Sequence, residues 1–280
     1  MPEAGPAPDE HAPQNLEAVA ATVARASAEL IRTQIGRATR LGAKSSPTDV
    51  VTRTDVDAEE LIRRLLADAT PDAGVLGEEG GQTPTPAGGE RNRLQWVVDP
   101  LDGTVNFLYS LPVMAVSVAA AFDGEVVAGA VVDVLRAETF SASAGTGARV
   151  DGDPIRVSRC PALARALVLT GFSYTAQIRG RQGDIVQSLL PAARDIRCFG
   201  SAALQLCWVG AGRADAYFER DIKVWDYAAG ALIAREAGAS TELPCPENDG
   251  LVIAATPAVF DELRTVVESP WSAPDAEGDR

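Results

Sequence analysis

The stretch that decides the fold of this chain reads WVVDPLDGTVNF, residues 96–107. An apolar strand leads into two carboxylates three positions apart, followed by Gly-Thr. Pro100 fixes its own φ angle and is predicted to end the strand, which puts Asp99 at the edge of a sheet and Asp102 in the turn beyond. Gly103 lets backbone N–H groups approach an anion, and the next residue adds a hydroxyl. Carboxylates for a hard cation beside amides for an anion predict metal-assisted phosphate chemistry.

The composition of the whole chain limits what it binds. With 280 residues, 46% of them hydrophobic, the chain can form one large domain or two modest ones. A net charge of −14 argues against a nucleic-acid or anionic-membrane partner, and no apolar run approaches membrane-spanning length. Residues 1–14 lack the basic and apolar regions of a secretion signal and are predicted, like residues 269–280, to be disordered tails. We therefore expect a cytoplasmic protein.

Cysteine and histidine usage excludes several chemistries. The four cysteines are far apart and form no Cys-x-x-Cys pair, so reduced thiols are expected. The single histidine, His11, lies in the predicted tail. Unless a partner supplies an imidazole, this excludes a Ser-His-Asp triad, a phosphohistidine intermediate and a histidine-ligated zinc. The chemistry must then use carboxylates, hydroxyls and metals.

Hydrophobic periodicity predicts helices layered on sheets in both halves of the chain. In the first half we expect helices over 15–40 and from about Asp55, a hairpin of strands 113–122 and 125–134 around Asp123-Gly124, and a strand at 139–142. The second half alternates between strands at 167–170, 196–199, 214–218 and 251–255 and helices at 182–194, 201–209, 226–237 and 257–268. This predicts an α/β sandwich with halves 15–152 and 153–268. The polar residues 82–92 are expected to form a mobile loop.

Four further pieces of sequence contain groups that could join the Asp99–Thr104 stretch. They are Lys44–Asp55, Gly77–Gly80, Phe199–Ala203, and Glu219 with Trp225–Ala229. Each alone has a plain structural explanation: a helix cap at Asp55, a charged turn, or helix caps at Ser201 and Asp226. Clustered carboxylates need cations, however, because two unit charges about 4 Å apart repel by about 4 kcal/mol at an effective dielectric of about 20.

These five pieces, in this order, resemble the inositol monophosphatase family over roughly residues 15–268, and its bacterial, above all actinobacterial, members most. The matching motifs are Lys44-Ser-Ser-Pro-x-Asp-x-Val-Thr-x-x-Asp55, Gly77-Glu-Glu, Trp96-x-x-Asp-Pro-Leu-Asp-Gly-Thr-Val-Asn-Phe107, Gly200-Ser-Ala-Ala203 and Trp225-Asp226. The resemblance implies the layered αβαβα sandwich shared with fructose-1,6-bisphosphatase. It also implies dependence on Mg²⁺, with Mn²⁺ as a possible substitute, inhibition by lithium, and a homodimer.

The resemblance also implies a metal-ligand set. One Mg²⁺ would be held by Glu78, Asp99 and the backbone carbonyl of Leu101, and a second by Asp99, Asp102 and Asp226. A third, weaker ion would use Glu78 and waters. Leu101 stands where isoleucine is commoner, but only its carbonyl is needed.

Further roles follow from the same motifs. Asp55 and Thr104, with Glu78, would orient and deprotonate the attacking water, and the amides of Gly103 and Thr104 would bind the phosphate. The alcohol part of the substrate would contact Asp102, Gly200, Ser201, Ala202, Glu219 and Asp226. Ser201 stands where threonine is frequent, which bears on how the alcohol is recognised.

The expected reaction is hydrolysis of a small phosphorylated alcohol, myo-inositol 1-phosphate, by attack of a metal-activated water. Relatives of the family act on histidinol phosphate, fructose 1,6-bisphosphate or adenosine 3′,5′-bisphosphate, and these remain alternatives. Residues 105–107 and 115–117 look more like the inositol branch than the histidinol-phosphate branch. A protein of a different class, a regulatory binding partner that retains this site, is also compatible with the sequence.

Two other phosphatase signatures are excluded. Cys207 and Arg213 have the spacing of cysteine-dependent phosphatases, but the cysteine falls inside an apolar helix instead of the loop before one, so we expect it in the core. Haloacid-dehalogenase-type enzymes need Asp-x-Asp after a buried strand. Asp99 and Asp102 are one residue too far apart, and Asp55-Val-Asp57 does not follow such a strand.

Overall fold

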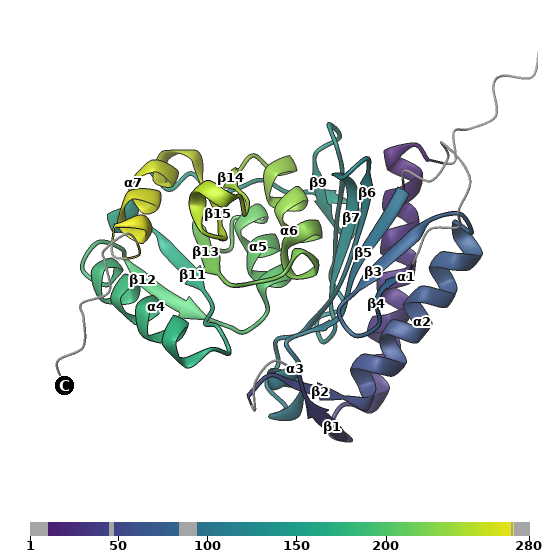
Figure 1. Ribbon diagram of the computed structural model, residues 1–280. Coiled ribbons are helices and arrows are strands. Elements are labelled where there is room, and N and C mark those ends of the chain that lie inside the picture. Colours follow the sequence, from purple (N-terminus) through teal and green to yellow (C-terminus); the bar gives the residue numbers. More distant parts are fainter. Residues whose placement is uncertain (1–10, 45–47, 84–93, 270, 272–280) are drawn as a thin grey trace, which may run out of the picture.

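The secondary structure stacks in five layers in the order helix, sheet, helix, sheet, helix (Figure 1). The structure is a computed structural model and describes residues 11–44, 48–83, 94–269 and 271. Most of the predicted tails and of the predicted loop at 82–92 lies outside these residues. The layering confirms the expected αβαβα sandwich. No helix among the described residues is long and apolar enough to cross a membrane.

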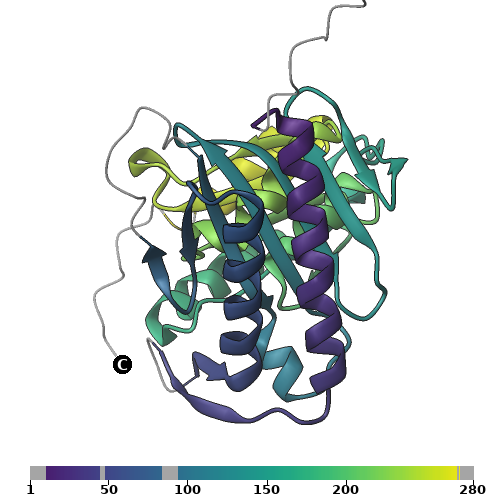
Figure 2. The same cartoon turned by 90° about the vertical axis from the view of Figure 1, so that its right-hand side faces the viewer.

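The first two layers come from the N-terminal half. Helices α1 (Pro13–Gln34) and α2 (Arg53–Ala69) lie side by side across one face of an eight-stranded sheet (Figure 2). The sheet has the order β10-β9-β8-β7-β6-β5-β3-β4. Its strands are β3 (Gly74–Gly77), β4 (Gly81–Thr83), β5 (Leu94–Asp102), β6 (Ala115–Phe122), β7 (Glu125–Asp133), β8 (Thr139–Ser143), β9 (Ala148–Val150) and β10 (Asp153–Pro154).

The other three layers come from the C-terminal half. Helices α5 (Ala202–Gly210) and α6 (Val224–Glu236) form the middle layer, and α4 (Ala176–Leu189) and α7 (Pro257–Glu268) form the far one. The five-stranded sheet between them has the order β12-β11-β13-β15-β14. Its strands are β11 (Leu167–Thr170), β12 (Asp195–Cys198), β13 (Ala216–Arg220), β14 (Ser240–Glu242) and β15 (Leu251–Ala255). Outside the layers lie β1 (Arg40–Ala43), β2 (Val50–Thr52), α3 (Thr104–Leu108) and the short 3₁₀ turns Leu163–Arg165 and Pro246–Asn248.

Strand β5 shows why its sequence is continuously apolar. Successive side chains of a strand point to opposite faces of the sheet. Trp96 and Val98 pack into the core under α1 and α2, while Val97 packs into the core against α5 and α6. Because helices cover both faces, both sets of side chains must be hydrophobic.

The observed elements confirm much of the predicted pattern. Strands β11 and β15 and helix α7 have the predicted bounds, and the hairpin of β6 and β7 turns at Asp123-Gly124. Both turn residues have positive φ angles, +53° and +84°, as a tight two-residue hairpin requires. The chain passes from the first sheet to the second after Pro154.

Two helices end earlier than the periodicity predicts. Helix α1 stops at Gln34 instead of residue 40, because Gly36 adopts φ +77° and the chain turns into β1. It also begins at Pro13, inside the predicted tail. Helix α4 ends at Leu189 instead of residue 194, because Pro191 has no N–H to continue the helical hydrogen bonds, and it begins at Ala176 instead of residue 182. Strands β1, β4, β9 and β14 were not predicted, since they are short and mostly exposed or half-buried.

The prediction that Pro100 ends its strand is wrong. Strand β5 continues to Asp102, and its pairing with β6 contains an irregularity between Asp99 and Asp102. A bulge leaves a residue without a ladder hydrogen bond, which is how a strand accommodates a proline.

Candidate active site

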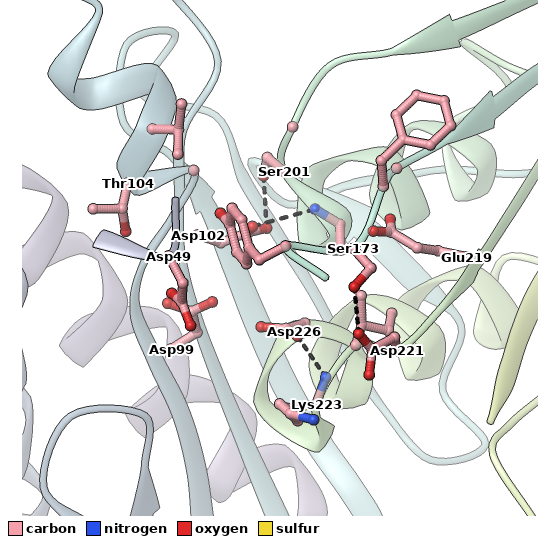
Figure 3. A pocket seen from close by; sticks show the side chains of 18 of the residues that line it. Asp49, Asp99, Asp102, Thr104, Ser173, Ser201, Glu219, Asp221, Lys223 and Asp226 are labelled. Atoms are coloured by element: carbon pink, nitrogen blue, oxygen red, sulfur yellow. Dashed lines mark hydrogen bonds between the residues drawn. The ribbon is translucent and has the colours of Figure 1, made fainter. Parts of the chain in front are cut away.

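A cavity of about 500 Å³ lies where the end of β5 faces the ends of β11, β12 and β13 (Figure 3). Strands β11, β12 and β13 run parallel, so their carboxyl ends open on the same side, the usual position of a ligand site in such sheets. Every residue predicted for the site lines this cavity except Asp55. Those residues are Glu78, Asp99, Leu101, Asp102, Gly103, Thr104, Gly200, Ser201, Ala202, Glu219 and Asp226.

The bulge in β5 brings Asp99 and Asp102 into the same cavity. In a regular strand, residues three positions apart point to opposite faces. Here Asp99 pairs with Ser117 and Asp102 with Ala115, so three steps on β5 match two on β6. The extra residue restores the facing of the second carboxylate. The irregularity at Pro100 is therefore what assembles this part of the site.

Glu78 reaches Asp99 because β3 and β5 are parallel neighbours. Gly77 pairs with Val98 in the ladder, so the residues that follow them emerge side by side. The two carboxyl groups are close enough for the charge of Glu78 to raise the pKa of Asp99. On its other side, Glu78 accepts a hydrogen bond from Lys44 Nζ at 2.8 Å.

Asp102 is held by the N-terminus of α5. Its Oδ2 accepts from the Ser201 hydroxyl at 2.7 Å and from the amide of Ala203 at 2.7 Å, and its Oδ1 accepts from the amide of Ala202 at 3.2 Å. A helix N-terminus stabilises a carboxylate in this position. Ser201 also caps α5, with its hydroxyl accepting from the amide of Leu204 at 3.4 Å. In this structure the Ser201 hydroxyl thus donates to Asp102. The contact of Ser201 with the alcohol part of the substrate stays a prediction.

Asp55 and Asp226 are each the third residue of a helix rather than its cap. Asp226 accepts from the amide of Lys223 at 2.6 Å, and Asp55 accepts from the amide of Thr52 at 2.8 Å and from its hydroxyl. Each aspartate thus accepts from the amide of the residue just before its helix, which is the N3 half of a capping box. The helix caps expected at these two aspartates lie instead at Thr52 and Lys223.

Asp55 lies behind Thr104 and is completely buried. Its Oδ1 accepts from the Thr104 hydroxyl at 2.8 Å, and that hydroxyl also lies 3.1 Å from the carbonyl oxygen of Leu101. Asp55 thus reaches the cavity only through Thr104. Gly103, just before this threonine, has φ +107°, and a Cβ there would lie 3.0 Å from the carbonyl oxygen of Val113, so only glycine fits.

Burial and mutual repulsion raise the pKa values of the acidic groups in the cavity. Burial, and after it the charges of Glu78 and Asp102, raises the pKa of Asp99 well above its usual range. The same causes raise the pKa of Asp226. Burial raises the pKa of Asp102 to about 7, although its hydrogen bonds to α5 oppose this. Burial also raises the pKa of Glu78, against the opposing charge of Lys44.

The donors in the cavity fit a hard divalent cation. Four carboxylates and the Leu101 carbonyl give an all-oxygen set, which suits Mg²⁺ or Mn²⁺ better than zinc. As the side chains stand, no group of three His, Cys, Asp or Glu residues in the described part of the chain is arranged to hold a metal ion. The carboxylates accept hydrogen bonds from the protein instead. Glu78 accepts from Lys44, Asp102 from the N-terminus of α5, and Asp226 from the Lys223 amide. Cations would replace these donors and relieve the repulsion.

The sequence pattern missed Ser173 and Asp221, which line the far wall of the cavity, and the buried Tyr217, which does not line it. Ser173 donates to Asp221 at 2.5 Å and ties the loop after β11 to the end of β13 (Figure 3). Tyr217 donates to Glu219 at 2.7 Å and orients it. Burial raises the pKa of Glu219 to about 8. Glu219 was predicted for the site, but no motif marks Ser173, Asp221 or Tyr217.

The two lysines carry a signal that could have been found. The 280-residue chain contains 23 arginines but only two lysines, Lys44 and Lys223, and both line the cavity. Arginine presents a planar fork of five donors, whereas lysine is a compact point charge on a flexible stem. Because the chain uses arginine at almost every other basic position, its two lysines could have been recognised from the sequence as candidate site residues.

The excluded cysteine mechanism stays excluded. Cys207 is completely buried in α5, and burial raises the pKa of its thiol well above the usual range. Arg213 is paired with Glu138 through two hydrogen bonds. The prediction that Cys207 belongs to the core is confirmed.

Comparison with known proteins places the chain among close relatives. The sequence model of the "Inositol monophosphatase family" matches residues 12–272 of this chain. An inositol-1-monophosphatase of Mycobacterium leprae is 44% identical over 274 residues, which are 91% of this chain and 94% of that protein. A "Nus factor SuhB" of Xylella fastidiosa is 45% identical over 196 residues, 70% of this chain and 69% of that protein. The solved structure of Mycobacterium tuberculosis SuhB has a TM-score of 0.78 and 38% identity, and covers 93% of this chain and 98% of its own.

Fold, cavity and relatives together define the class: the chain is a phosphatase built as an αβαβα sandwich. More narrowly, it belongs to the inositol monophosphatase family.

Proposed function

We propose that the chain hydrolyses phosphomonoesters with the help of Mg²⁺, and that myo-inositol 1-phosphate is its preferred substrate. The observation that carries this proposal is the crowding of Glu78, Asp99, Asp102 and Asp226 in one buried cavity, where their pKa values are raised by burial and by one another. Such crowding is a large unfavourable interaction that divalent cations would remove.

Glu78, Asp99, the Leu101 carbonyl, Asp102 and Asp226 would hold two ions, and Glu78 would contribute to a third. Bound there, the ions would neutralise the phosphate oxygens, lower the pKa of a water molecule and stabilise the leaving alkoxide. No histidine and no covalent intermediate is needed.

The chain's own groups would position the reactants. The Thr104 hydroxyl donates to Asp55, so its oxygen has a lone pair free to accept a hydrogen bond from the attacking water. Asp55 would then receive the proton through Thr104 Oγ1. The amides of Gly103 and Thr104 would bind the phosphate. Glu219, which is held by Tyr217, would accept hydrogen bonds from hydroxyl groups of the alcohol.

A panel of substrates under saturating Mg²⁺ tests the proposal. Phosphate release is expected to be fastest from myo-inositol 1-phosphate, and slower from histidinol phosphate, fructose 1,6-bisphosphate and adenosine 3′,5′-bisphosphate. A different order of kcat/KM would move the chain to another branch of the family. If phosphate were released from none of the four compounds, the proposed hydrolysis of phosphomonoesters would be contradicted.

A second role is favoured by one observation, the name "Nus factor SuhB" that a relative carries. A regulatory partner with a retained site would not depend on turnover. A catalytically dead Asp99→Asn variant that still complements loss of the chain in cells would support this second role. Lithium inhibition, a homodimer and a cytoplasmic location remain expectations, and an activity assay with added lithium and sedimentation of the pure chain would test the first two.

A further inference from the structure

A buried carboxylate outside the cavity lies directly behind one of the proposed metal ligands. Glu59, on α2, is only 3% exposed and does not line the cavity. It follows Asp55 by four residues, so the two carboxylates lie on the same face of the helix, one turn apart. Neither the sequence motifs nor the proposed chemistry uses Glu59.

Glu59 binds the backbone of the turn that carries Glu78. Its Oε2 accepts from the amide of Glu79 at 2.8 Å, and its Oε1 accepts from the amide of Gly80 at 2.8 Å. Arg63 Nε donates to Oε1 at 2.8 Å and balances the charge. The two residues after Glu78 are therefore tied to α2 by charge-assisted hydrogen bonds, which are about twice as strong as neutral ones.

The two glycines of this turn provide the space for Glu59. A Cβ on Gly77 would lie 2.5 Å from Glu59 Oε1, and one on Gly80 would lie 2.8 Å from the same oxygen. Neither glycine has a positive φ angle. Glycine is therefore needed at both positions because the backbone approaches the carboxylate closely, and not because of its conformation.

Helix α2 thus holds two parts of the site in a fixed relation. Through Asp55 it fixes Thr104, and through Glu59 it fixes the turn after β3. Arg63 extends the tie, since its Nη2 donates to the carbonyl of Gly81 at 2.6 Å.

We propose that Glu59 is a positioning residue for the metal site: it holds the 78–80 turn on α2 so that the Glu78 carboxylate meets Asp99. This rests on the proposed function, in which Glu78 is a metal ligand. Groups that orient a ligand without touching the metal typically change metal affinity by roughly 10- to 100-fold, because a ligand that must be ordered on binding loses affinity.

The test compares Glu59→Gln with Glu60→Gln, the exposed neighbour on the same helix. Mg²⁺ binding is measured by calorimetry without substrate, and exchange of the Glu79 and Gly80 amides is measured by hydrogen–deuterium exchange. We expect Glu59→Gln to weaken Mg²⁺ binding at least about tenfold and to speed exchange of those two amides, with Glu60→Gln like the wild type. In an activity assay, Glu59→Gln should raise the Mg²⁺ concentration needed for the half-maximal rate by a larger factor than it lowers kcat.

A second variant, Gly80→Ala, covers the case in which Glu59→Gln does not fold. It removes neither Glu59 nor Arg63, but its Cβ would lie 2.8 Å from Glu59 Oε1 and 3.0 Å from Arg63 Nη2 and so push the turn off this pair. It should weaken Mg²⁺ binding too. Wild-type Mg²⁺ affinity in a folded Glu59→Gln or Gly80→Ala protein would overturn the inference. If the wild type itself bound no Mg²⁺, the proposed function would fail, and that result is distinct from equal binding by wild type and variants.

Discussion

At the scale of single residues, the site combines groups that serve the fold and the chemistry at once. Asp55 and Asp226 complete helix caps, and Asp102 is bound by a helix N-terminus. From the sequence alone, a cap and a ligand are indistinguishable, because both require an aspartate near the start of a helix. The five motifs in order identified the carboxylates, whereas Ser173, Tyr217 and Glu59 belong to no motif and emerged only from their contacts.

Asp99→Asn should separate catalysis from stability. Asp99 is 2% exposed and crowded by three other carboxylates, so removing its charge should leave the metal-free protein at least as stable. Turnover should fall by roughly 10³-fold, since several kcal/mol of charge stabilisation are lost. Phosphate release and thermal unfolding measure the two effects, and Asp68→Asn on the exposed face of α2 is the control. Near-normal turnover in Asp99→Asn after treatment with a chelator would contradict the role of this carboxylate.

At the scale of elements, the strand–helix pattern was predictable but the irregularities were not. Periodicity identified β11, β15 and α7 correctly, because each is a regular element whose hydrophobic side chains are buried on one face or on both. It could not predict the bulge in β5, since whether a strand ends or bulges at a proline depends on the pairing strand. The bulge matters most here, because it turns Asp102 into the cavity.

A strained turn at the end of β13 gives a prediction at this scale. Asp221 has φ +67°, a conformation in which glycine is more stable by about 1 kcal/mol, yet its side chain accepts from Ser173. Asp221→Gly should relieve strain and lose one hydrogen bond of similar size, so unfolding temperature should change little. The 171–175 loop should loosen, and KM should rise about fivefold, as a loss of about 1 kcal/mol predicts.

Asp123→Gly is the matched control for this turn. Asp123 also has a positive φ angle, +53°, but it lies in the β6–β7 hairpin and does not line the cavity. Its replacement should leave KM unchanged. If both variants raised KM equally, or if Asp221→Gly left KM untouched, the Ser173–Asp221 tie would have no part in substrate binding.

At the scale of the whole molecule, the acidic site makes stability depend on pH and Mg²⁺ together. Carboxylates whose folded pKa lies above the unfolded value of about 4 bind protons more tightly when folded. Their protonation therefore stabilises the metal-free protein at low pH, and this stability is lost as pH rises through the folded values, about 7 for Asp102. Mg²⁺ would replace the lost protons.

We therefore expect Mg²⁺ to raise the unfolding temperature more at about pH 8 than at about pH 5.5. Without Mg²⁺, unfolding temperature should fall across the same interval. Differential scanning calorimetry with and without the ion measures both, and Asp99→Asn should reduce the difference. Equal stabilisation by Mg²⁺ at the two pH values would mean that the ion does not compete with protons for these carboxylates.

The central claim is that four carboxylates from three separate segments gather divalent cations in one cavity. Crystals of the chain soaked in Mn²⁺, with diffraction measured at the manganese absorption edge, test it most directly. We predict at least two anomalous peaks between Glu78, Asp99, Asp102 and Asp226, each about 2.1–2.2 Å from carboxylate oxygens, close to the 2.0–2.1 Å expected for Mg²⁺. A well-ordered cavity with no peak, or peaks only at surface carboxylates elsewhere, would contradict the account.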